Sequence, residues 1–480
     1  MTTFVLLIAI CVCFFISQPL DKSPFVLYNE SENILHKRRT GMQNISINVN
    51  FDNVLGKVKP MHAVNNMPTL PRNGNGWDEK MAAAHIPFGR LHDTGGAFGG
   101  SRYVDIPNVF PDFDADENDP ANYDFAFTDV LLERMVKSGV EPYYRLGVTI
   151  ENYVDIKSYR IDPPKDNAKW ARICEHIIMH YNEGWADGFH YNITYWEIWN
   201  EPDNYPEIEL NQLWRGTMEQ YFELYETAAT YLKNRFPNLK IGGYGSCGFY
   251  HLNRVDVSNI AHSTNRFDYF IEFFHKFLEY MSARKVPLDF FGWHTYAGLK
   301  DNIAFANYPR QHLDKYGYTH TEIHLNEWNP GVAERGKLKD ASNILGVMIS
   351  QHATPTDMCM YYDFRWWSTY CGAVNPLDRS PFKAYYAFYN FGQLYALGKN
   401  VECSVAGNDV YALAATNGEN GGIAVSNNSG EDVMLNITAL GLENKTAKLY
   451  MTDETHIHDE IEADLTALIL PKDAILYIEY

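Results

Sequence analysis

Residues 195–202 have the sequence YWEIWNEP, in which a run of aromatic and branched side chains is followed at once by Asn, Glu and Pro. Aromatic and β-branched residues favour strands, and a proline does not continue a strand inside a sheet. The stretch therefore predicts a strand over 195–200 that places Glu201 at its carboxyl end. Seven other short runs have the same character and occupy 46–51, 87–92, 142–147, 240–245, 289–296, 322–328 and 358–364.

Helical patterns lie between these predicted strands. One helical face is formed by Trp170, Ile173, Cys174, Ile177 and Tyr181, and other helices are expected over 127–136, 213–236 and 381–397. Eight strands that alternate with helices predict an α/β fold, a (β/α)8 TIM barrel within residues 46–397. A doubly wound sheet shows the same alternation, but none of the strands is followed by a G-x-G-x-x-G loop.

The pattern changes after residue 397. Residues 398–480 contain short alternating runs, such as DVYALAA and AILYIEY, which are separated by Asn, Gly and Asp turns. This pattern is typical of a small β-sandwich, which we expect as an accessory domain. Residues 23–45 are a candidate source of one or two additional strands for it.

Charge and motifs exclude several functional classes. The chain has 480 residues, with 40 Lys and Arg against 60 Asp and Glu, and its net charge of −20 argues against a nucleic-acid partner. It contains neither a phosphate loop nor a metal motif such as H-E-x-x-H, so no cofactor and no metal are expected. Aromatic residues make up 15% of the chain, which fits either a bulky core or rings that stack on sugars.

The amino terminus carries an apolar run, FVLLIAICVCFFI, at 4–16. Its length matches the hydrophobic part of a signal peptide and is short for a membrane span. We therefore expect a signal peptide within residues 1–22, a secreted or extracytoplasmic location, and no integral membrane span in the mature chain. Because no Lys or Arg precedes the run and no clear A-x-A site follows it, an uncleaved anchor or a misassigned start codon stays open.

Two strand-end glutamates carry the functional prediction. Glu201 follows the fourth predicted strand, Glu327 ends the seventh, and each is preceded by an asparagine. Catalytic groups of parallel barrels lie at the carboxyl ends of strands, and strands four and seven lie on roughly opposite sides of the barrel. Glycoside hydrolysis needs two such carboxyl groups, one that protonates the leaving oxygen and one that attacks or activates water.

W-x-x-W-N-E-P followed by a second N-E-W resembles the motifs of clan A glycoside hydrolases, which are retaining barrel enzymes. The nearer resemblance is to glycoside hydrolase family 39, which includes β-xylosidases and α-L-iduronidases, and it covers roughly residues 46 to 480. The motifs that carry it are EIWNEPD (197–203), HLNEW (324–328), FGRLHD (88–93), WHTY (293–296) and YYD (361–363), together with the C-terminal β-sandwich.

The resemblance implies roles for individual residues. Glu201 would be the acid/base and Glu327 the nucleophile, while Asn200 would bind the sugar hydroxyl next to the reacting carbon. Arg90 would keep Glu327 ionised, Tyr296 would donate a hydrogen bond to it, and His294 would line the same wall. Further candidates for substrate binding are His92, Trp328 and Trp366. The structural alternatives are a pairing of Arg90 with a buried Glu197, and core packing for His294 and the tryptophans.

The sequence thus predicts a retaining glycosidase that works through a covalent glycosyl-enzyme intermediate, exo-acting and similar to β-xylosidases. Its partner would be an oligosaccharide or glycoside. Endo action, another sugar (as in an arabinofuranosidase or an iduronidase) and a carbohydrate-binding pseudoenzyme are the alternatives. The long loop over 94–122 departs from the family pattern and argues against borrowing the substrate. An acidic sugar would need cations to bind its carboxylate, and Arg145 or Arg365 could serve. The sequence leaves the oligomeric state open.

Overall fold

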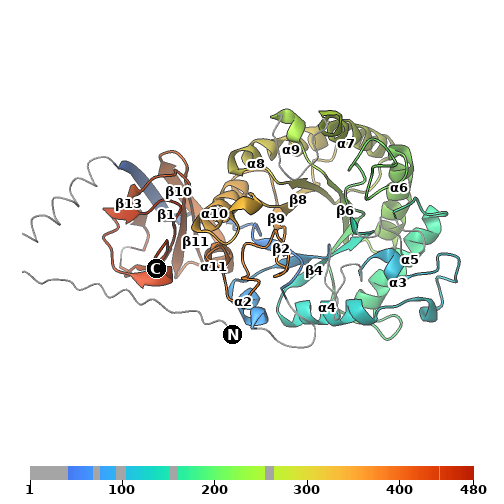
Figure 1. The fold of residues 1–480 in the computed structure, drawn as a ribbon, viewed down its shortest axis with the longest axis horizontal. Helices are drawn as coiled ribbons and strands as arrows, with labels where there is room; N and C mark the ends of the chain where they lie inside the picture. Colours follow the sequence, from blue (N-terminus) through green and yellow to red (C-terminus); the bar gives the residue numbers. More distant parts are fainter. Residues whose placement is uncertain (1–41, 69–75, 93–103, 151–160, 254–263, 443) are drawn as a thin grey trace, which may run out of the picture. The chain divides into compact units, whose positions relative to one another are not determined.

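The computed structural model describes residues 42–480, apart from 69–75, 93–103, 151–160, 254–263 and 443 (Figure 1). The predicted signal peptide and the segment proposed to donate strands, up to residue 41, lie outside the described residues. Among the described residues, no helix combines the length and the apolar character needed to cross a membrane.

A closed barrel of eight parallel strands forms the larger part of the described chain, which confirms the predicted fold class (Figure 1). Its strands, in the order of the barrel, are β2 (Ala63–Asn65), β3 (Phe88–Arg90), β4 (Glu141–Leu146), β5 (Tyr195–Ile198), β6 (Lys240–Ser246), β7 (Phe290–Thr295), β8 (Glu322–Trp328) and β9 (Met358–Tyr361). Seven of the eight match predicted runs.

The first barrel strand was predicted wrongly. Residues 46–51 belong to β1 (Gln43–Lys57), which pairs antiparallel with β10 in the second sheet and not with any barrel strand. The first barrel strand is β2, which lies between β3 and β9. β1 alternates buried and exposed side chains over its first half, a pattern that a strand with one solvated face shows in any sheet.

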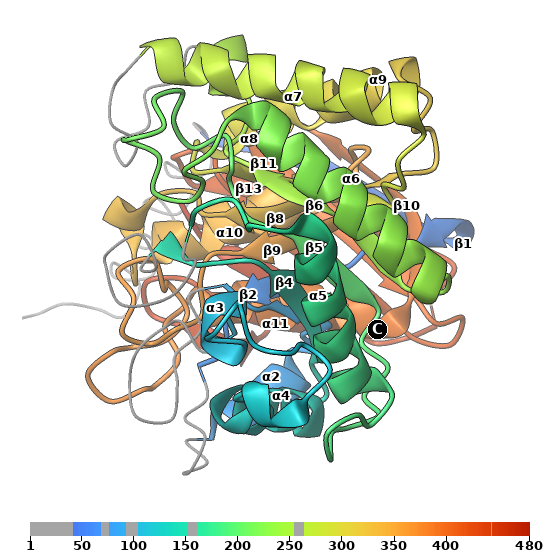
Figure 2. The same cartoon turned by 90° about the vertical axis from the view of Figure 1, so that its right-hand side faces the viewer.

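Helices cover the outside of the barrel. They are α2 (Trp77–Ala83), α3 (Ile106–Val109), α4 (Ala126–Lys137), α5 (Asn167–Asn182), α6 (Met218–Arg235), α7 (Thr264–Arg284), α8 (Leu299–Phe305), α9 (Asn307–Lys315), α10 (Leu338–His352) and α11 (Tyr385–Leu397). Figure 2 shows α5, α6 and α7 side by side over the strands β5 and β6. The apolar face predicted for residues 170–181 is buried on α5, as expected. Helix α6 begins at a capping box of Thr217 and Gln220 and ends before Pro237.

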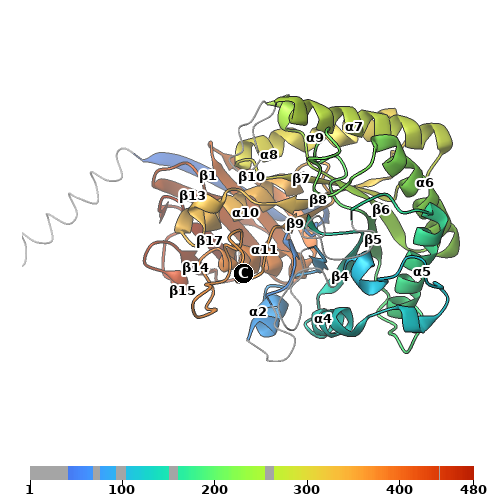
Figure 3. The same ribbon diagram turned by 45° about the vertical axis from the view of Figure 1, so that its right-hand side comes forward.

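The second sheet has nine strands in the order β15-β14-β17-β12-β11-β10-β1-β13-β16. After β1 these are β10 (Lys399–Ala406), β11 (Val410–Thr416), β12 (Gly421–Asn427), β13 (Val433–Leu440), β14 (Lys448–Thr452), β15 (Ile457–Ile461), β16 (Leu468–Leu470) and β17 (Ile475–Glu479). Apolar side chains from eight of these strands meet in one core, so the sheet curls around it as a β-sandwich does. Helices α10 and α11 pack against β11, β12 and β17 (Figure 3).

The barrel interior is layered. At the amino-terminal ends of the strands an apolar layer contains Tyr143, Phe290 and Met358, with Phe88 and Tyr195 packed against it. Polar side chains lie on the same strands closer to their carboxyl ends, among them Arg90 on β3 and Glu197 on β5. The apolar layer thus forms a rigid floor under a polar layer, and the site is built on that polar layer.

Candidate active site

A strained turn carries Glu201 into the mouth of the barrel. The strand β5 ends at Ile198, and both Trp199 (φ 74°) and Glu201 (φ 45°) have left-handed backbone conformations. Such conformations are costly for residues with large side chains and are found where the surroundings hold them. Here the backbone N–H of Glu201 points at the carbonyls of Tyr244 (3.2 Å) and Gly245 (3.0 Å) on β6. The turn therefore aims the Glu201 carboxyl at the barrel axis.

Glu327 reaches the same place from β8. The pairing of β8 with both of its neighbours is irregular around Asn326 and Glu327, so both side chains point toward the barrel interior. The Tyr296 hydroxyl donates a hydrogen bond to one Glu327 oxygen, and Arg90 Nη1 donates to the other at 3.2 Å. Glu327 is thus held by one neutral donor and one cation.

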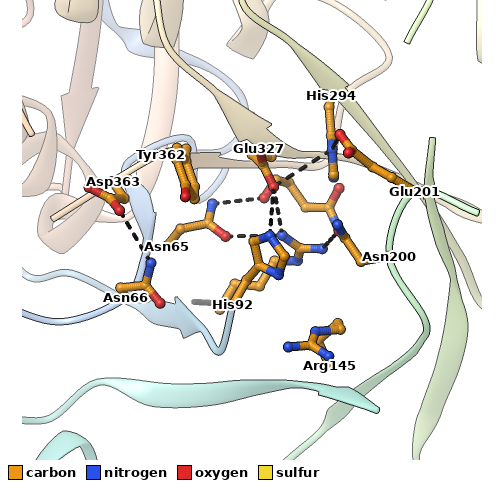
Figure 4. Close-up of polar contacts among 12 residues, drawn as sticks. Asn65, Asn66, His92, Arg145, Asn200, Glu201, His294, Glu327, Tyr362 and Asp363 are labelled. Atoms are coloured by element: carbon orange, nitrogen blue, oxygen red, sulfur yellow. Dashed lines mark hydrogen bonds and ion pairs between the residues drawn. The ribbon is translucent and has the colours of Figure 1, made fainter. Parts of the chain in front are cut away.

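The two carboxyl groups face each other across His294. Its Nδ1 lies 2.7 Å from Glu201 Oε1 and 3.7 Å from Glu327 Oε2 (Figure 4). One oxygen of each carboxyl and a ring nitrogen of His294 all lie within 4.8 Å of one another. Carboxyl groups this close are spaced for a carboxylate pair that acts on one atom between them.

Arg90 organises the polar layer beneath the pair. It is fully buried, and its Nε donates to Glu197 at 2.7 Å while its Nη2 donates to Asn200 Oδ1 at 2.5 Å. Asn326 Nδ2 donates to the other Glu197 oxygen at 2.6 Å. The two interpretations of Arg90 therefore do not exclude each other, because one guanidinium binds both the buried acid Glu197 and the candidate nucleophile Glu327.

Burial raises the pKa of Glu201 and of Glu327, because both carboxyls are enclosed in the barrel. Arg90 and the Tyr296 hydroxyl contact Glu327 directly and lower its pKa, and they do not bond to Glu201. Burial also lowers the pKa of His294 to about 4, so this imidazole is neutral near pH 7. Glu327 is therefore the carboxyl whose ionised form these two donors stabilise directly.

The structure brings together most of the predicted site residues. One contact network contains Glu201, Glu327, Asn200, Arg90, His294 and Tyr296. His92 Nε2 lies 3.8 Å from Glu327 Oε2 (Figure 4). The Asn200 side-chain amide nitrogen is buried and has no hydrogen-bond partner among the described residues, as expected of a donor to a substrate hydroxyl.

Of the two tryptophans, Trp328 does not fit the predicted role, whereas the role of Trp366 stays a prediction. Trp328 is fully buried and packs edge-on against Tyr361 in the hydrophobic core, because the residue after Glu327 points to the outside of the barrel. It therefore offers no face to a sugar. Trp366 is half-buried after β9, and the Arg379 guanidinium lies over its ring.

The two cations considered for an acidic sugar both bind acids of the protein. Arg145 is fully buried and donates from Nη2 to Asp105 at 2.7 Å. Arg365 donates from Nε to Asp363 at 2.6 Å. In the Asp-rich segment at 112–119, Glu117 is buried against Arg172.

Sequence reasoning missed part of the supporting network. Asn65 on β2 donates to the carbonyls of Asn326 (2.9 Å) and Met360 (3.1 Å) and accepts from Arg90. Asn204 donates from Nδ2 to Glu201 Oε2 at 3.0 Å. The signal for Asn204 was its place three residues after Glu201. Asn65 lies on a strand of three residues, which is too short to show any periodicity.

Glu201, His294 and Glu327 also have the donor types of a metal site. A cation there would have to share Glu327 Oε2 with the Arg90 guanidinium, which already donates to it at 3.2 Å. We therefore expect these groups to act as an acid–base pair and not as metal ligands.

Gly245 is a position where a side chain would damage this site. Its φ is +64°, and a Cβ there would lie 3.1 Å from Asn200 Oδ1, 3.1 Å from His294 Nε2 and 3.2 Å from Glu197 Oε1. We expect Gly245→Ala to cost about 1–2 kcal/mol for the left-handed backbone, and to lower kcat/KM roughly 100-fold by displacing catalytic groups.

Gly139→Ala is the matched control, because Gly139 also has a left-handed φ of +77° but a Cβ there meets no heavy atom within 4 Å. It should lose similar stability in thermal unfolding and keep its activity. Equal activities of the two variants would contradict the tight packing proposed around Gly245.

The barrel with two facing strand-end carboxyls defines the class of the protein as a glycosidase. Residues 108–365 match the model for "Glycosyl hydrolases family 39", which is more than half of the chain, and the chain therefore belongs to this family. The predicted family is confirmed.

Curated relatives and solved structures extend this finding. A β-xylosidase of Geobacillus stearothermophilus is 21% identical over 303 residues, which are 55% of this chain and 54% of the relative. A β-xylosidase of Caldicellulosiruptor saccharolyticus is 29% identical over 136 residues, 26% of each chain. The aligned part thus spans about half of the first relative's length and a quarter of the second's.

Among solved structures, a glucosidase from Croceicoccus marinus has a TM-score of 0.70 at 21% identity, with 91% of this chain and 98% of that chain covered. A family 39 β-xylosidase from Caulobacter crescentus has a TM-score of 0.64 at 16% identity, with 90% and 99% covered. At these identities the likeness shows the shared fold.

Proposed function

We propose that the chain is a retaining, exo-acting glycosidase of the β-xylosidase type, with Glu201 as acid/base and Glu327 as nucleophile. The observation that carries the proposal is the separation of the two carboxyls, because one oxygen of each and a ring nitrogen of His294 all lie within 4.8 Å of one another. Retaining enzymes place their carboxyls about 5–5.5 Å apart, whereas inverting enzymes need roughly 6.5–9.5 Å to admit a water molecule.

The proposed reaction has two displacements. In the first, Glu327 attacks the anomeric carbon while Glu201 gives its proton to the leaving oxygen, and a glycosyl ester of Glu327 forms. In the second, Glu201 takes a proton from water, and the water oxygen displaces Glu327 from the anomeric carbon. Two inversions give net retention and return both carboxyls to their starting states.

The neighbours of the two carboxyls support this division of roles. Arg90 and Tyr296 stabilise the ionised form of Glu327, as a nucleophile requires. Glu201 is bonded to the neutral groups Asn204 and His294, and its burial favours the protonated form that an acid requires.

Exo action is supported by the enclosure of the site. The Glu201 and Glu327 side chains are 15% and 7% exposed. An endo-acting enzyme needs an open groove that a polymer can cross, and we take carboxyls recessed to this degree as support for a substrate that presents its terminal sugar.

The test is hydrolysis of an aryl glycoside panel, with the product followed by proton NMR in the first minutes. The panel holds β-xyloside, β-glucoside, β-galactoside, α-L-arabinofuranoside and α-L-iduronide. We expect one sugar to be cleaved preferentially, with the initial product in the anomeric configuration of the substrate. An initial product of the opposite configuration would refute the double displacement.

A further inference from the structure

The turn that carries Glu201 is fastened to the end of β6 by its neighbour Asp203. The Asp203 side chain is fully buried and accepts hydrogen bonds from the Ser246 hydroxyl (2.9 Å) and from the backbone N–H of Cys247 (3.2 Å). The Glu201 N–H bonds to the β6 carbonyls of Tyr244 and Gly245. Alternate residues of the turn are therefore bound to the same strand end.

The next residue, Asn204, also links the turn to its surroundings. Its Nδ2 donates to Glu201 Oε2 at 3.0 Å and lies 3.6 Å from Cys247 Sγ, while Arg266 on α7 donates to its backbone carbonyl at 2.5 Å. Asp203 thus lies between the candidate acid and the residue that orients its carboxyl. A change in the placement of Asp203 would move both.

Asp203 is also a second acidic group in the same buried space. Its two donors are neutral. The ionisable groups that face it are Glu201 on its own loop, Tyr244 on β6, Cys247 directly after β6, Tyr221 on α6 and Tyr269 on α7, with Arg266 beyond Glu201. Burial and the charge of Glu201 raise the pKa of Asp203 to about 7. Two carboxyls in one apolar space do not ionise independently, so the pair titrates as a unit.

We propose that Asp203 is a positioning residue for Glu201, which holds the Glu201 turn on the end of β6 and places a second buried carboxyl beside the acid. The inference rests on the proposed role of Glu201. The hydrogen bonds from Ser246 and Cys247 hold the Asp203 carboxyl at the end of β6, and through it the turn that carries Glu201. Asp203 does not contact the substrate or the reacting atoms.

The test compares Asp203→Asn with the wild type across pH, on two aryl glycosides of the sugar that the panel selects. One has a poor leaving group, a phenol, and the other has an activated one, a dinitrophenol. We expect kcat/KM for the phenyl glycoside to fall roughly 10- to 100-fold, within the range of a general acid's contribution. The alkaline limb of its pH profile should also move, because the two buried carboxyls titrate as a unit and the variant removes one of them.

The dinitrophenyl glycoside separates positioning from a loss of structure. Its leaving group departs without a proton, so a variant with a displaced or ionised acid should keep the first displacement, measured as the burst of dinitrophenolate. Equal losses on both substrates, with an unmoved alkaline limb, would overturn the proposal, because that result describes general damage to the fold.

Two further variants serve as a weaker perturbation and as a control. Ser246→Ala removes one donor to Asp203 and should shift the alkaline limb in the same direction by a smaller amount. Glu183→Gln is the matched control, since this surface carboxyl is bonded to Arg235 and should leave the profile unchanged. A wild type that hydrolyses no glycoside would overturn the proposed function and this inference together. An active wild type with an unaltered Asp203→Asn profile would overturn the inference alone.

Discussion

Glu327→Gly should lose at least roughly 10⁴-fold in kcat on every aryl glycoside that the wild type cleaves, as expected when the group that forms the covalent intermediate is removed. The loss should be the same for good and poor leaving groups, because no nucleophile attacks the anomeric carbon in either case. The measurement is the initial rate on the selected aryl glycoside, with the folded state checked by thermal unfolding.

Added azide identifies the position of the missing nucleophile. In the glycine variant the space left by the carboxyl can hold an azide ion next to Arg90, which in the wild type bonds to Glu327 at 3.2 Å. Azide would attack the face that Glu327 normally attacks and would give a glycosyl azide of inverted configuration. Glu327→Gln is the matched control, because its amide fills the same space and should prevent rescue. A rescued product of retained configuration would contradict the assignment of Glu327.

The fold could be predicted, and the candidate catalytic pair could be located, because each rests on a local signal. Seven barrel strands are short aromatic or branched runs bounded by clear turns, and the two glutamates follow strand-end asparagines. A catalytic group at a strand end is placed by the architecture of the barrel itself, so its position follows once the strand is found.

The prediction failed for β1 and β2, because their place in a sheet depends on partner strands that are far away in the sequence. β1 has the alternation of a half-buried strand, but whether it joins the barrel or pairs with Ser404 and Cys403 of β10 depends on contacts more than 350 residues away. β2 has three residues and therefore no periodic pattern, yet it carries Asn65 into the site.

Backbone irregularity explains the remaining differences. In a regular strand Asn326 and Glu327 would point to opposite faces, but the irregular pairing at this point turns both toward the barrel interior and leaves Trp328 in the outer core. The left-handed residues Trp199 and Glu201 re-aim the other carboxyl in a similar way. Such local distortions depend on the surrounding contacts, and the sequence of the strand itself does not reveal them.

Glu201→Ala should divide the substrates by their leaving groups. On a phenyl glycoside, whose oxygen needs a proton to depart, kcat/KM should fall about 10²- to 10⁴-fold, the usual contribution of a general acid. On a dinitrophenyl glycoside the first displacement should keep most of its rate. The second displacement, which needs Glu201 as a base, should become limiting, so the intermediate accumulates and a burst of dinitrophenolate appears.

Azide and pH complete the assignment. Azide should speed the second displacement in Glu201→Ala, because an anion that needs no base replaces water, and its product should have retained configuration, opposite to that from Glu327→Gly.

Burial raises the pKa of Glu201, so in the wild type the acid form persists toward neutral pH and its loss produces the alkaline limb of kcat/KM. That limb should be absent from Glu201→Ala on the dinitrophenyl substrate. An alkaline limb that persists there, or equal losses on both leaving groups, would show that another group supplies the proton. Of the two carboxyls His294 contacts, the acid would then have to be Glu327, whose bonds to Arg90 and Tyr296 oppose protonation.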